Sequence, residues 1–511
     1  MTEIPGEFGD IAFVGFGEAR HALASIRIRL AHGTTRAYVL KLRSVIIKGL
    51  EALTTECLLA ARRAAEEVWV TLRAFGLLDW MSRGYRQVAE EAGVLGYGSR
   101  RGQSGAAGRY GAGKTVISRN LRHLRLFAAV ADLKSLTLTS EKWHISQPAV
   151  TQAVNKLERE AGGALFERSR HGFFLTPRGE VLLQRVEGAF GLLDPVLNDI
   201  SPRLRMSLSY AQLQALVTVS ESENFTLAAR RLGLAQPTVH RAVTQIEQAA
   251  ARSLFERTSF GILPTRLCQA LAQAVRLAIY EFDQADAELA EFNGGEAGAI
   301  VIGALPLARS GILPQALARF RAERPTFPVR IHDGPYEELL GALRRGAIDF
   351  LVGALREPAP IGDIVQQRLF DDRLALLARP GHPLADRSDL TVDDLLAFPW
   401  VVPRRGTPTR DQFETLFTSA GKEPPRRLIE SGSLLLMREL LNESQHLGCL
   451  SRHQSQRECD HGLLVSLNYP TDHLVRPIGL TIRENWRPTR AQKLMLELVA
   501  GAAPEKNPHS Q

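Results

Sequence analysis

The chain has 511 residues, of which 45% are hydrophobic and 23% are charged. At about 100 to 200 residues per domain, this length excludes a single small domain and predicts three or four folded units of ordinary globular composition. The formal net charge of +8 suits a polyanionic partner, but it does not by itself separate a DNA-binding protein from a basic enzyme.

Cysteine usage and hydrophobic patterning indicate where the protein works. Cys57, Cys268, Cys449 and Cys459 are scattered along the chain, which predicts neither a disulfide framework nor a CxxC metal pair. No stretch approaches the roughly 20 apolar residues of a membrane span, and acidic residues occupy the N-terminus where a signal peptide carries lysine or arginine. We therefore expect a cytoplasmic protein with no metal and no membrane partner.

The first 118 residues begin with a motif similar to a dinucleotide-binding turn. Residues 12–20 read AFVGFGEAR, and together with residues 41–63 they resemble the 6-phosphogluconate dehydrogenase-like NAD-binding proteins. Arg20 stands where the motif has its third glycine, and the residues between the two segments are too few for a Rossmann fold. We expect residues 1–118 to be a degenerate helical and disordered extension without a cofactor. A fusion that retains an NAD-dependent oxidoreductase-like part is the alternative.

A second nucleotide-binding pattern lies at the end of this extension. Residues 108–115, GRYGAGKT, match the phosphate-binding pattern GxxxxGK[ST] letter for letter. Such a loop must follow a buried strand and open a helix of a nucleotide-binding sheet. Here RRGQSGAA precedes the motif and a helix-turn-helix pattern follows it, so the context argues against ATP binding.

The next part of the chain contains an internal repeat. QPAVTQAVNKLE at residues 147–158 returns as QPTVHRAVTQIE at residues 236–247, and LFER at 165–168 returns at 254–257, in both cases 89 positions later. Each copy predicts a first helix with apolar residues at helical spacing, then a short helix, a tight turn and a third helix that begins with Gln-Pro. This order is the helix-turn-helix pattern. Proline is accepted there because the first helical turn needs no N–H from it.

The third helix of each copy has a clear buried face. Apolar residues at spacings of four and three predict it, namely Val150, Val154 and Leu157 in the first copy and Val239, Val243 and Ile246 in the second. Ser146 is the expected N-cap of the first copy, whereas Ala235 cannot cap the second. Residues 166–176, with Gly172 near the tip, predict a hairpin wing.

These patterns divide the middle of the chain into three parts. We expect the first winged helix-turn-helix and its connector helix at 119–200, the second winged helix-turn-helix at 206–265, and a linker helix at 266–295. The connector helix is expected over residues 178–199 and should end at Asp194-Pro195 and Ser201-Pro202. The linker helix carries an apolar stripe, formed by Leu271, Val275, Leu277, Phe282 and Leu289. We expect this stripe to form a dimer interface, and a single helix that faces solvent is the alternative.

After Asn293 the pattern changes to alternating strands and helices. Strands are expected at 299–305, 329–334, 348–355, 373–379, 400–403 and 447–451, and helices at 313–324, 336–345 and 409–419. Strand, helix and strand at this spacing predict a parallel sheet. Residues 357–362 interrupt the alternation. We therefore expect two α/β lobes over residues 296–495, joined by a crossover, and a disordered tail at 496–511.

Several of these segments carry a family resemblance. SQPAVTQAVNKLEREAGGALFERSRHGFFLTPRG (146–179), NFTLAARRLGLAQPTVHRAVTQIE (224–247), and LPQALARFRAERP (313–325) with ARPGHPLAD (378–386) resemble the LysR-type transcriptional regulators. The resemblance implies a winged helix-turn-helix that reads double-stranded operator DNA, a homodimer or homotetramer built on linker helices, and RNA polymerase as a further candidate partner. It also implies a periplasmic-binding-protein-like domain that senses a small effector. The expected fold is multidomain, with two tandem α winged helix-turn-helix copies and an α/β two-lobed domain.

The chain departs from the family pattern in three places. Family members usually have one DNA-binding module, whereas this chain has two copies. The first copy has Thr139-Ser140 where the family favours paired alanines and Trp143 where leucine is usual, and the second departs at its wing, LPTRLC (263–268). One copy acting as a docking or dimerisation unit is therefore the alternative to two DNA-reading copies.

The DNA-binding surface is expected on the polar face of each third helix and on the wings. Amides there can pair with adenine, and arginine with guanine or phosphate. Residues 119–180 carry ten lysines and arginines against six acidic residues, and residues 209–267 carry six against four, so both modules are positive. The candidate residues are Gln147, Pro148, Thr151, Gln152, Asn155, Arg168, Arg170, Gln236, Pro237, Thr238, His240, Arg241 and Arg257.

The effector site is expected between the lobes, because open α/β domains bind ligands at the carboxyl ends of strands. This rule selects Leu305, Pro306, Arg309, Ser310, His332, Asp333, Arg404 and Thr407. Arginines suit a carboxylate-bearing effector, assisted by N–H groups at the helix start near Thr407. No Ser/His/Asp, Cys/His or paired-carboxylate constellation follows from the spacing, so we do not expect an enzyme. The missing export signal and the two DNA modules oppose a solute-binding protein.

Overall fold

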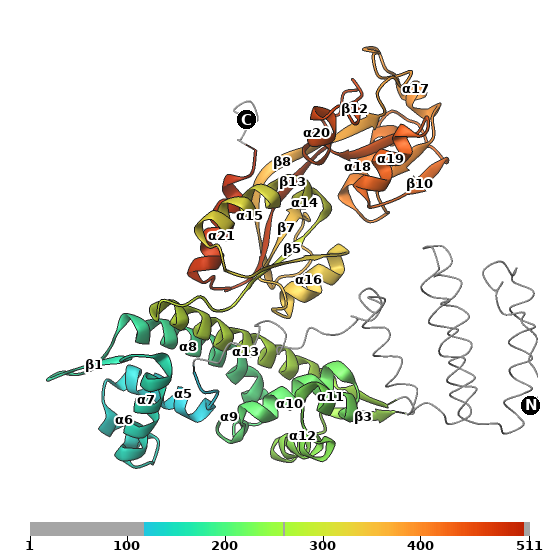
Figure 1. The fold of residues 1–511 in the computed structure, drawn as a ribbon. Coiled ribbons are helices and arrows are strands. Elements are labelled where there is room, and N and C mark those ends of the chain that lie inside the picture. The colour runs from blue at the N-terminus through green and yellow to red at the C-terminus, as the bar shows by residue number, and fades with distance from the viewer. Residues whose placement is uncertain (1–116, 259–260, 505–511) are drawn as a thin grey trace, which may run out of the picture. The chain divides into compact units, whose positions relative to one another are not determined.

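The computed structural model describes residues 117–258 and 261–504 (Figure 1). The expectations for the N-terminal extension lie outside these residues, including both nucleotide-binding resemblances at 12–63 and 108–115. The last residues of the expected tail, 505–511, also lie outside them.

The first module has the expected order of helices and hairpin. It consists of α5 (Leu121–Leu133), α6 (Leu136–Lys142), α7 (Gln147–Ala161), β1 (Phe166–Ser169), β2 (Gly172–Leu175) and the connector helix α8 (Pro177–Ile200). Contrary to expectation, the Ser146 side chain does not cap α7. Pro148 has no N–H to offer it, and the Ala149 N–H bonds the Ser146 carbonyl oxygen instead.

The second module repeats this order. It consists of α9 (Leu204–Ser207), α10 (Tyr210–Ser222), α11 (Phe225–Leu232), α12 (Gln236–Ala250), β3 (Phe255–Thr258), β4 (Gly261–Pro264) and α13 (Arg266–Phe292). The six apolar residues expected to form the buried faces of α7 and α12 are at most 2% exposed, which confirms that prediction. Thr139 and Ser140 are also buried, and their hydroxyls donate to carbonyl oxygens three or four residues earlier. The departure from paired alanines therefore leaves both hydroxyls hydrogen-bonded.

The two long helices lie where the sequence predicts them. α8 ends at Ile200, directly before Ser201-Pro202, as expected. It continues through Asp194-Pro195, the other expected end, because Leu193, Leu197 and Ile200 are buried on both sides of the proline. α13 has the expected length, but it packs against α8 of the same chain (Figure 1). The stripe that we assigned to a dimer seam is therefore covered within the chain. Leu277, expected in that stripe, is only partly buried.

The C-terminal domain is built on a continuous sheet. Its elements are β5 (Ile300–Ala304), α14 (Pro306–Ser310), α15 (Ile312–Glu323), β6 (Val329–Asp333), α16 (Tyr336–Arg344), β7 (Phe350–Ala354), β8 (Ile364–Ala378), α17 (Val392–Leu396), β9 (Trp400–Val402), α18 (Pro408–Thr418), β10 (Leu428–Glu430), α19 (Leu434–Asn442), β11 (Leu447–Ser451), α20 (Arg452–Asp460), β12 (Val465–Ser466), β13 (Val475–Arg483) and α21 (Arg490–Gly501). The strand order is β10-β9-β11-β8-β13-β7-β5-β6, with β12 beside β8. β5 pairs in parallel with β6 and β7, as expected.

Two long antiparallel strands join the two lobes. β8 pairs with β13 in the first lobe and with β11 in the second. Separate hydrophobic cores form around Phe350 in the first lobe and Trp400 in the second. β8 starts at Ile364, nine residues before the expected strand at 373. Backbone pairing to β13 holds this first stretch, in which exposed and buried residues are mixed without a strong apolar pattern.

The chain remains ordered beyond the point where we expected a disordered tail. Residues 496–501 belong to α21, which begins with a capping box formed by Thr489 and Gln492. Met495 and Val499 of this helix are fully buried in the core of the first lobe. The effector domain therefore continues past residue 495.

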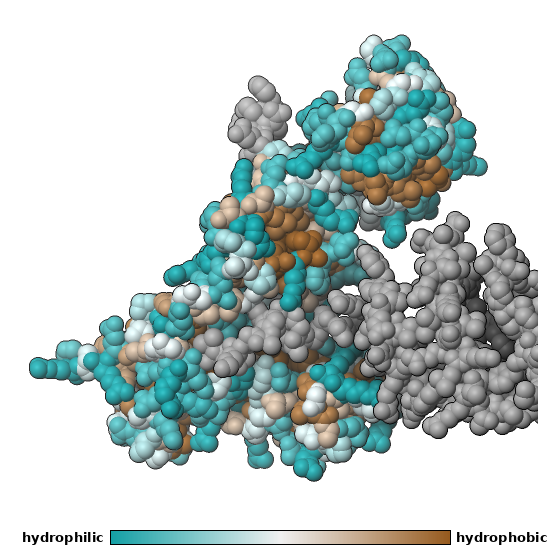
Figure 2. Space-filling view, in the orientation of Figure 1, coloured by the Kyte–Doolittle hydropathy of each residue, from teal (hydrophilic) through white to brown (hydrophobic). Residues whose placement is uncertain are grey.

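Apolar side chains are exposed on the second lobe. Figure 2 shows apolar patches over this lobe, and the exposed residues there include Ile429 on β10 and Leu435 and Leu436 on α19. β10 is the last strand in the sheet order at this end. Exposed apolar surface of this kind is typical of regions that contact another protein.

Candidate DNA interface and effector site

The outward face of α7 forms one continuous polar surface. Gln147, Pro148, Gln152 and Asn155 are exposed, and Thr151 is partly exposed. The Thr151 hydroxyl donates to the Gln147 carbonyl oxygen at 3.1 Å. All five residues line a shallow groove along the helix. The structure therefore brings together the residues of this helix that were expected to read DNA, with both glutamine amides accessible.

The equivalent face of α12 is less uniform. Its exposed candidate residues are Gln236, Pro237, Thr238 and Arg241. His240 is only partly exposed, because its ring packs against Phe225 with the ring centres 5.0 Å apart. The His240 Nδ1 lies 3.4 Å from the Thr244 hydroxyl oxygen. His240 is therefore held against its own module, and Arg241 is the exposed cation of this face.

Both wings present arginine to solvent. Arg168 on β1 and Arg257 on β3 are exposed, as is Arg170 in the turn between β1 and β2. The Arg168 guanidinium lies 5.5 Å from the ring centre of Phe173 on the neighbouring strand. This cation–π contact orients the side chain along the hairpin.

Sequence reasoning missed the residue that attaches each wing to its recognition helix. The carboxylate of Glu158 at the end of α7 accepts hydrogen bonds from the N–H groups of residues 165 and 166, at 3.0 and 3.3 Å. Glu247 of α12 accepts the same pair of bonds from residues 254 and 255, at 2.8 and 3.3 Å. Repetition of glutamate at the 89-residue offset is the signal that could have identified both residues.

The expected effector residues of the first lobe lie at the carboxyl ends of its strands. Leu305 and Pro306 begin α14 directly after β5. His332 and Asp333 end β6, which is the edge strand of the sheet. Arg309 and Asp333 form an ion pair at 2.9 Å, with 41% and 66% of the two side chains exposed. Arg309 is therefore partly neutralised at the surface.

The remaining expected residues lie on both lobes. Ser310 ends α14 in the first lobe and is partly buried. Arg404 and Thr407 precede α18 in the second lobe, where Arg404 and the neighbouring Arg405 are exposed. The Thr407 hydroxyl donates to the Arg404 carbonyl oxygen at 2.7 Å instead of capping α18.

A pair of residues that sequence reasoning missed combines burial with unpaired polar atoms. Arg356 follows β7, and its guanidinium lies 4.4 Å from the ring centre of Tyr336, the first residue of α16. Within the described part of the chain, the Arg356 Nη1 and the Tyr336 hydroxyl are buried without a hydrogen-bond partner. Burial raises the pKa of Tyr336 and lowers the pKa of Arg356. Buried donors without acceptors are costly, so the pair suits a ligand that supplies acceptors.

The position of Arg356 explains why it was overlooked. The rule that ligands bind at the carboxyl ends of strands selects Leu305 after β5, Asp333 at the end of β6 and Arg404 after β9. β7 is parallel to β5 and lies on the side toward the second lobe. The same rule applied to β7 selects Arg356.

A buried ion pair lies on the two long strands near this position. The Arg476 guanidinium on β13 is 3.1 Å from the Asp372 carboxylate on β8, and the two side chains are 9% and 2% exposed. Arg476 also donates to the Thr409 hydroxyl of α18, and Asp372 accepts the backbone N–H of His453 at 3.1 Å. The charge of Arg476 contributes, after burial, to the lowered pKa of Arg356. The two cations therefore act on the same region between the lobes.

Comparison with known proteins assigns both parts of the described chain. A family model described as the LysR substrate binding domain matches residues 293–504. Another, described as a bacterial regulatory helix-turn-helix protein of the lysR family, matches residues 121–180 and 210–269. The HTH-type transcriptional regulator GalR of Pseudomonas putida is 35% identical over 367 residues, which cover 71% of this chain and 92% of that relative. The chain belongs to the LysR family of transcriptional regulators.

Other proteins match a smaller share of the chain at lower sequence identity. PcaQ of Agrobacterium fabrum is 26% identical over 298 residues, 58% of this chain and 96% of PcaQ. Full-length OxyR C199D from Pseudomonas aeruginosa is 20% identical with a TM-score of 0.43, covering 59% of this chain and 99% of that one. The LysR family regulator CbnR is 20% identical with a TM-score of 0.41, covering 58% and 100%.

The two family models and the similarity to GalR confirm the expected family and function. As a LysR-type transcriptional regulator, the protein combines helix-turn-helix DNA binding with an effector-binding domain. GalR and PcaQ are both named as HTH-type transcriptional regulators, and neither supports the oxidoreductase alternative. In residues 117–258 and 261–504, no helix has the length and hydropathy to span a membrane.

Proposed function

We propose that both modules of this LysR-type regulator bind operator DNA, and that a small carboxylate-bearing effector binds between the lobes and modulates that binding. The exposed polar face of each recognition helix carries the proposal for DNA. Direct readout needs side chains that reach base edges in the major groove, while phosphate contacts position the protein. Gln147, Gln152, Gln236 and Arg241 suit the first role, and the wing arginines suit the second.

The proposal for the effector rests on Tyr336 and Arg356. A carboxylate accepts hydrogen bonds from a guanidinium and from a phenol, so it would satisfy both unpaired atoms at once. Because β8 and β13 cross between the lobes, a ligand that touches both lobes would favour one lobe arrangement. It would shift a pre-existing equilibrium by its differential affinity for the two arrangements.

Self-association into dimers or tetramers and contact with RNA polymerase belong to the same proposal, because the family resemblance implies them. The exposed apolar residues Ile429, Leu435 and Leu436 support a contact through the effector domains. α13 is already covered by α8 of its own chain, so we do not assign that contact to the linker helices.

Selection of bound sequences from random duplex DNA by the intact chain tests the DNA proposal. We expect one enriched class of sequence. We also expect affinity for it to fall steeply between about 50 and 200 mM salt, because bound lysines and arginines release counterions from the DNA. Weak binding at physiological salt with no enriched sequence would contradict the proposal.

Arg356→Met and Arg309→Met separate the two candidate effector positions. We expect at least one member of a panel of aliphatic and aromatic carboxylates to raise the Tm of the wild-type chain and of Arg309→Met. Its affinity for Arg356→Met should fall about 10- to 100-fold, because a hydrogen bond to a charged group contributes about 1.5–3 kcal/mol. Loss of the response in Arg309→Met alone would move the site to the edge of β6. A panel without any Tm shift would exclude the carboxylate class.

A further inference from the structure

We infer that a single chain supplies both halves of a two-fold DNA-binding unit, so that one protein molecule occupies both half-sites of its operator. The inference rests on the proposed function for the DNA contacts themselves. Its own basis is the packing of α8 against α13. In a homodimer, such a pair of long helices would join two subunits. Here both helices belong to one chain.

α8 and α13 run antiparallel. Near the start of α8, the Arg178 guanidinium lies 5.3 Å from the ring centre of Phe292, the last residue of α13. Midway along both helices, Phe190 and Phe282 pack edge to face with ring centres 6.0 Å apart. An antiparallel pair of equivalent helices is the arrangement that a two-fold axis produces.

Aspartates at equivalent positions of α8 and α13 each pair with arginine. Asp194 of α8 and Asp283 of α13 are 89 positions apart, which is the offset of the sequence repeat. Asp283 pairs at 2.8 Å with Arg119, just before the first helix of the first module. Asp194 pairs at 2.5 Å with Arg125 of its own module and at 3.0 Å with Arg205 of α9. Ion pairs from both long helices therefore link the two modules within one chain.

The interface between α8 and α13 leaves little apolar surface on these helices for a second copy of the chain. One continuous hydrophobic core extends through both modules and both long helices, from Ile117 to Leu289. Among the large apolar side chains that the structure describes as exposed, none lies on α13, and Leu192 is the one on α8. An amphipathic helix whose apolar stripe is already buried has no second apolar face with which to bind another helix.

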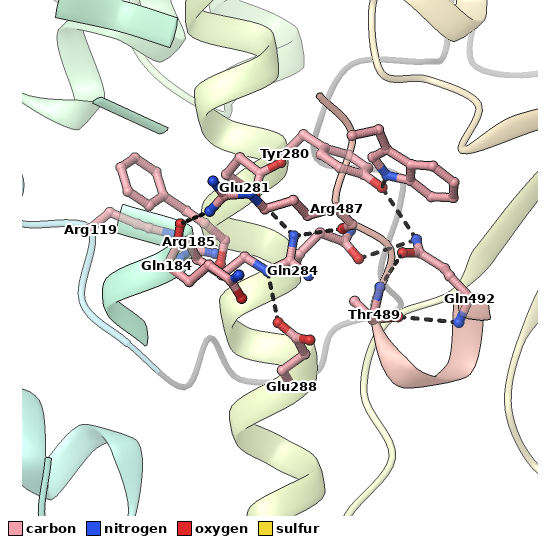
Figure 3. Close-up of polar contacts among 12 residues, drawn as sticks. Arg119, Gln184, Arg185, Tyr280, Glu281, Gln284, Glu288, Arg487, Thr489 and Gln492 are labelled. Carbon is pink, nitrogen blue, oxygen red and sulfur yellow. Dashed lines mark hydrogen bonds and ion pairs between the residues drawn. The ribbon is translucent and has the colours of Figure 1, made fainter. Parts of the chain in front are cut away.

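The interface between α8 and α13 also contacts the effector domain. Arg185 of α8 is 1% exposed and pairs with Glu281 and Glu288 of α13 at 2.9 and 2.7 Å (Figure 3). Its guanidinium also donates to the Arg487 carbonyl oxygen, between β13 and α21, at 2.9 Å. Burial opposes the charge of Arg185, but hydrogen bonds and charge from the two glutamates outweigh it and raise its pKa. One effector domain is thus joined to two DNA-binding modules. A homodimer of chains with one module each would have two effector domains for its two modules.

Footprinting with one altered module tests this inference. On an operator recovered by selection, the Gln236→Ala/Arg241→Ala chain at saturating concentration should protect one half-site and lose protection of the other. In a homodimer with one reading module per chain, both chains carry the substitutions, so both half-sites would weaken equally. With the duplex in excess, native mass spectrometry of the wild-type complex should give one duplex with two half-sites for each chain, whether or not chains associate through their effector domains. Equal loss at both half-sites, unchanged protection of both, or two chains for each duplex when the duplex is in excess would overturn the inference.

A cross-link that needs no DNA separates failure of this inference from failure of the proposed function. A Cβ at Gly188 would lie 3.6 Å from Glu281 Cγ, so Gly188→Cys and Glu281→Cys bring two thiols within reach of a disulfide. With Cys57 and Cys459 replaced by serine, the oxidised double variant should migrate as a monomer on a denaturing gel. Differently tagged chains that carry one cysteine each, expressed together, should give no mixed dimer. A mixed disulfide dimer would show that α8 pairs with α13 of another chain and would overturn the inference.

Discussion

The Gln147→Ala/Gln152→Ala chain should bind its selected operator between about 30-fold and about 10⁴-fold more weakly than the wild type, because each bidentate amide contact contributes about 1–3 kcal/mol. Both side chains are exposed on α7, so their removal should leave the fold intact. Fluorescence-anisotropy titration with the selected duplex measures the loss. An unrelated duplex should be bound as before, because the phosphate contacts remain.

Gln315→Ala/Gln445→Ala is the matched control for this variant. It also removes two exposed amides, but from the effector domain. Its operator affinity should equal that of the wild type. If the control loses as much affinity as the α7 variant, the loss does not report base recognition. If neither variant changes affinity, the first module does not read DNA through these amides.

Arg476→Met should lower the free energy of unfolding of the effector domain by about 3–5 kcal/mol, because it leaves the Asp372 carboxylate buried without its cation. Asp372 is 2% exposed, and the Thr409 hydroxyl loses a donor in the same variant. Urea titration followed by circular dichroism measures the change. Arg476→Met/Asp372→Leu should recover part of the lost stability, since an apolar pair leaves no buried charge.

Arg373→Met provides the comparison for a surface ion pair. Arg373 and Asp472 lie 2.5 Å apart, but 40% and 75% of their side chains are exposed. Solvent screens such a pair, so we expect a loss below about 1 kcal/mol. Equal losses in Arg373→Met and Arg476→Met would mean that burial does not set the contribution of the inner pair.

The sequence alone determined those features that depend on local periodicity and repetition. The spacing of Val150, Val154 and Leu157 identified the buried face of α7, because a helix places residues three and four apart on one side. The repeat at 89 residues marked two modules, and the strand-helix-strand order indicated the parallel part of the sheet. The polar candidates of α7 followed from the same helical period, since they occupy the face opposite the core.

Tertiary structure decided which elements meet. Periodicity shows that the stripe on α13 must be buried, but it does not identify the partner, and within this chain α13 packs against α8. β8 is extended through its polar first half by pairing with β13, which lies about a hundred residues later. Tyr336, Arg356 and Arg476 come from α16, the segment after β7, and β13. Their proximity depends on contacts between residues far apart in the chain, which no local pattern records, so only the folded structure could bring them together.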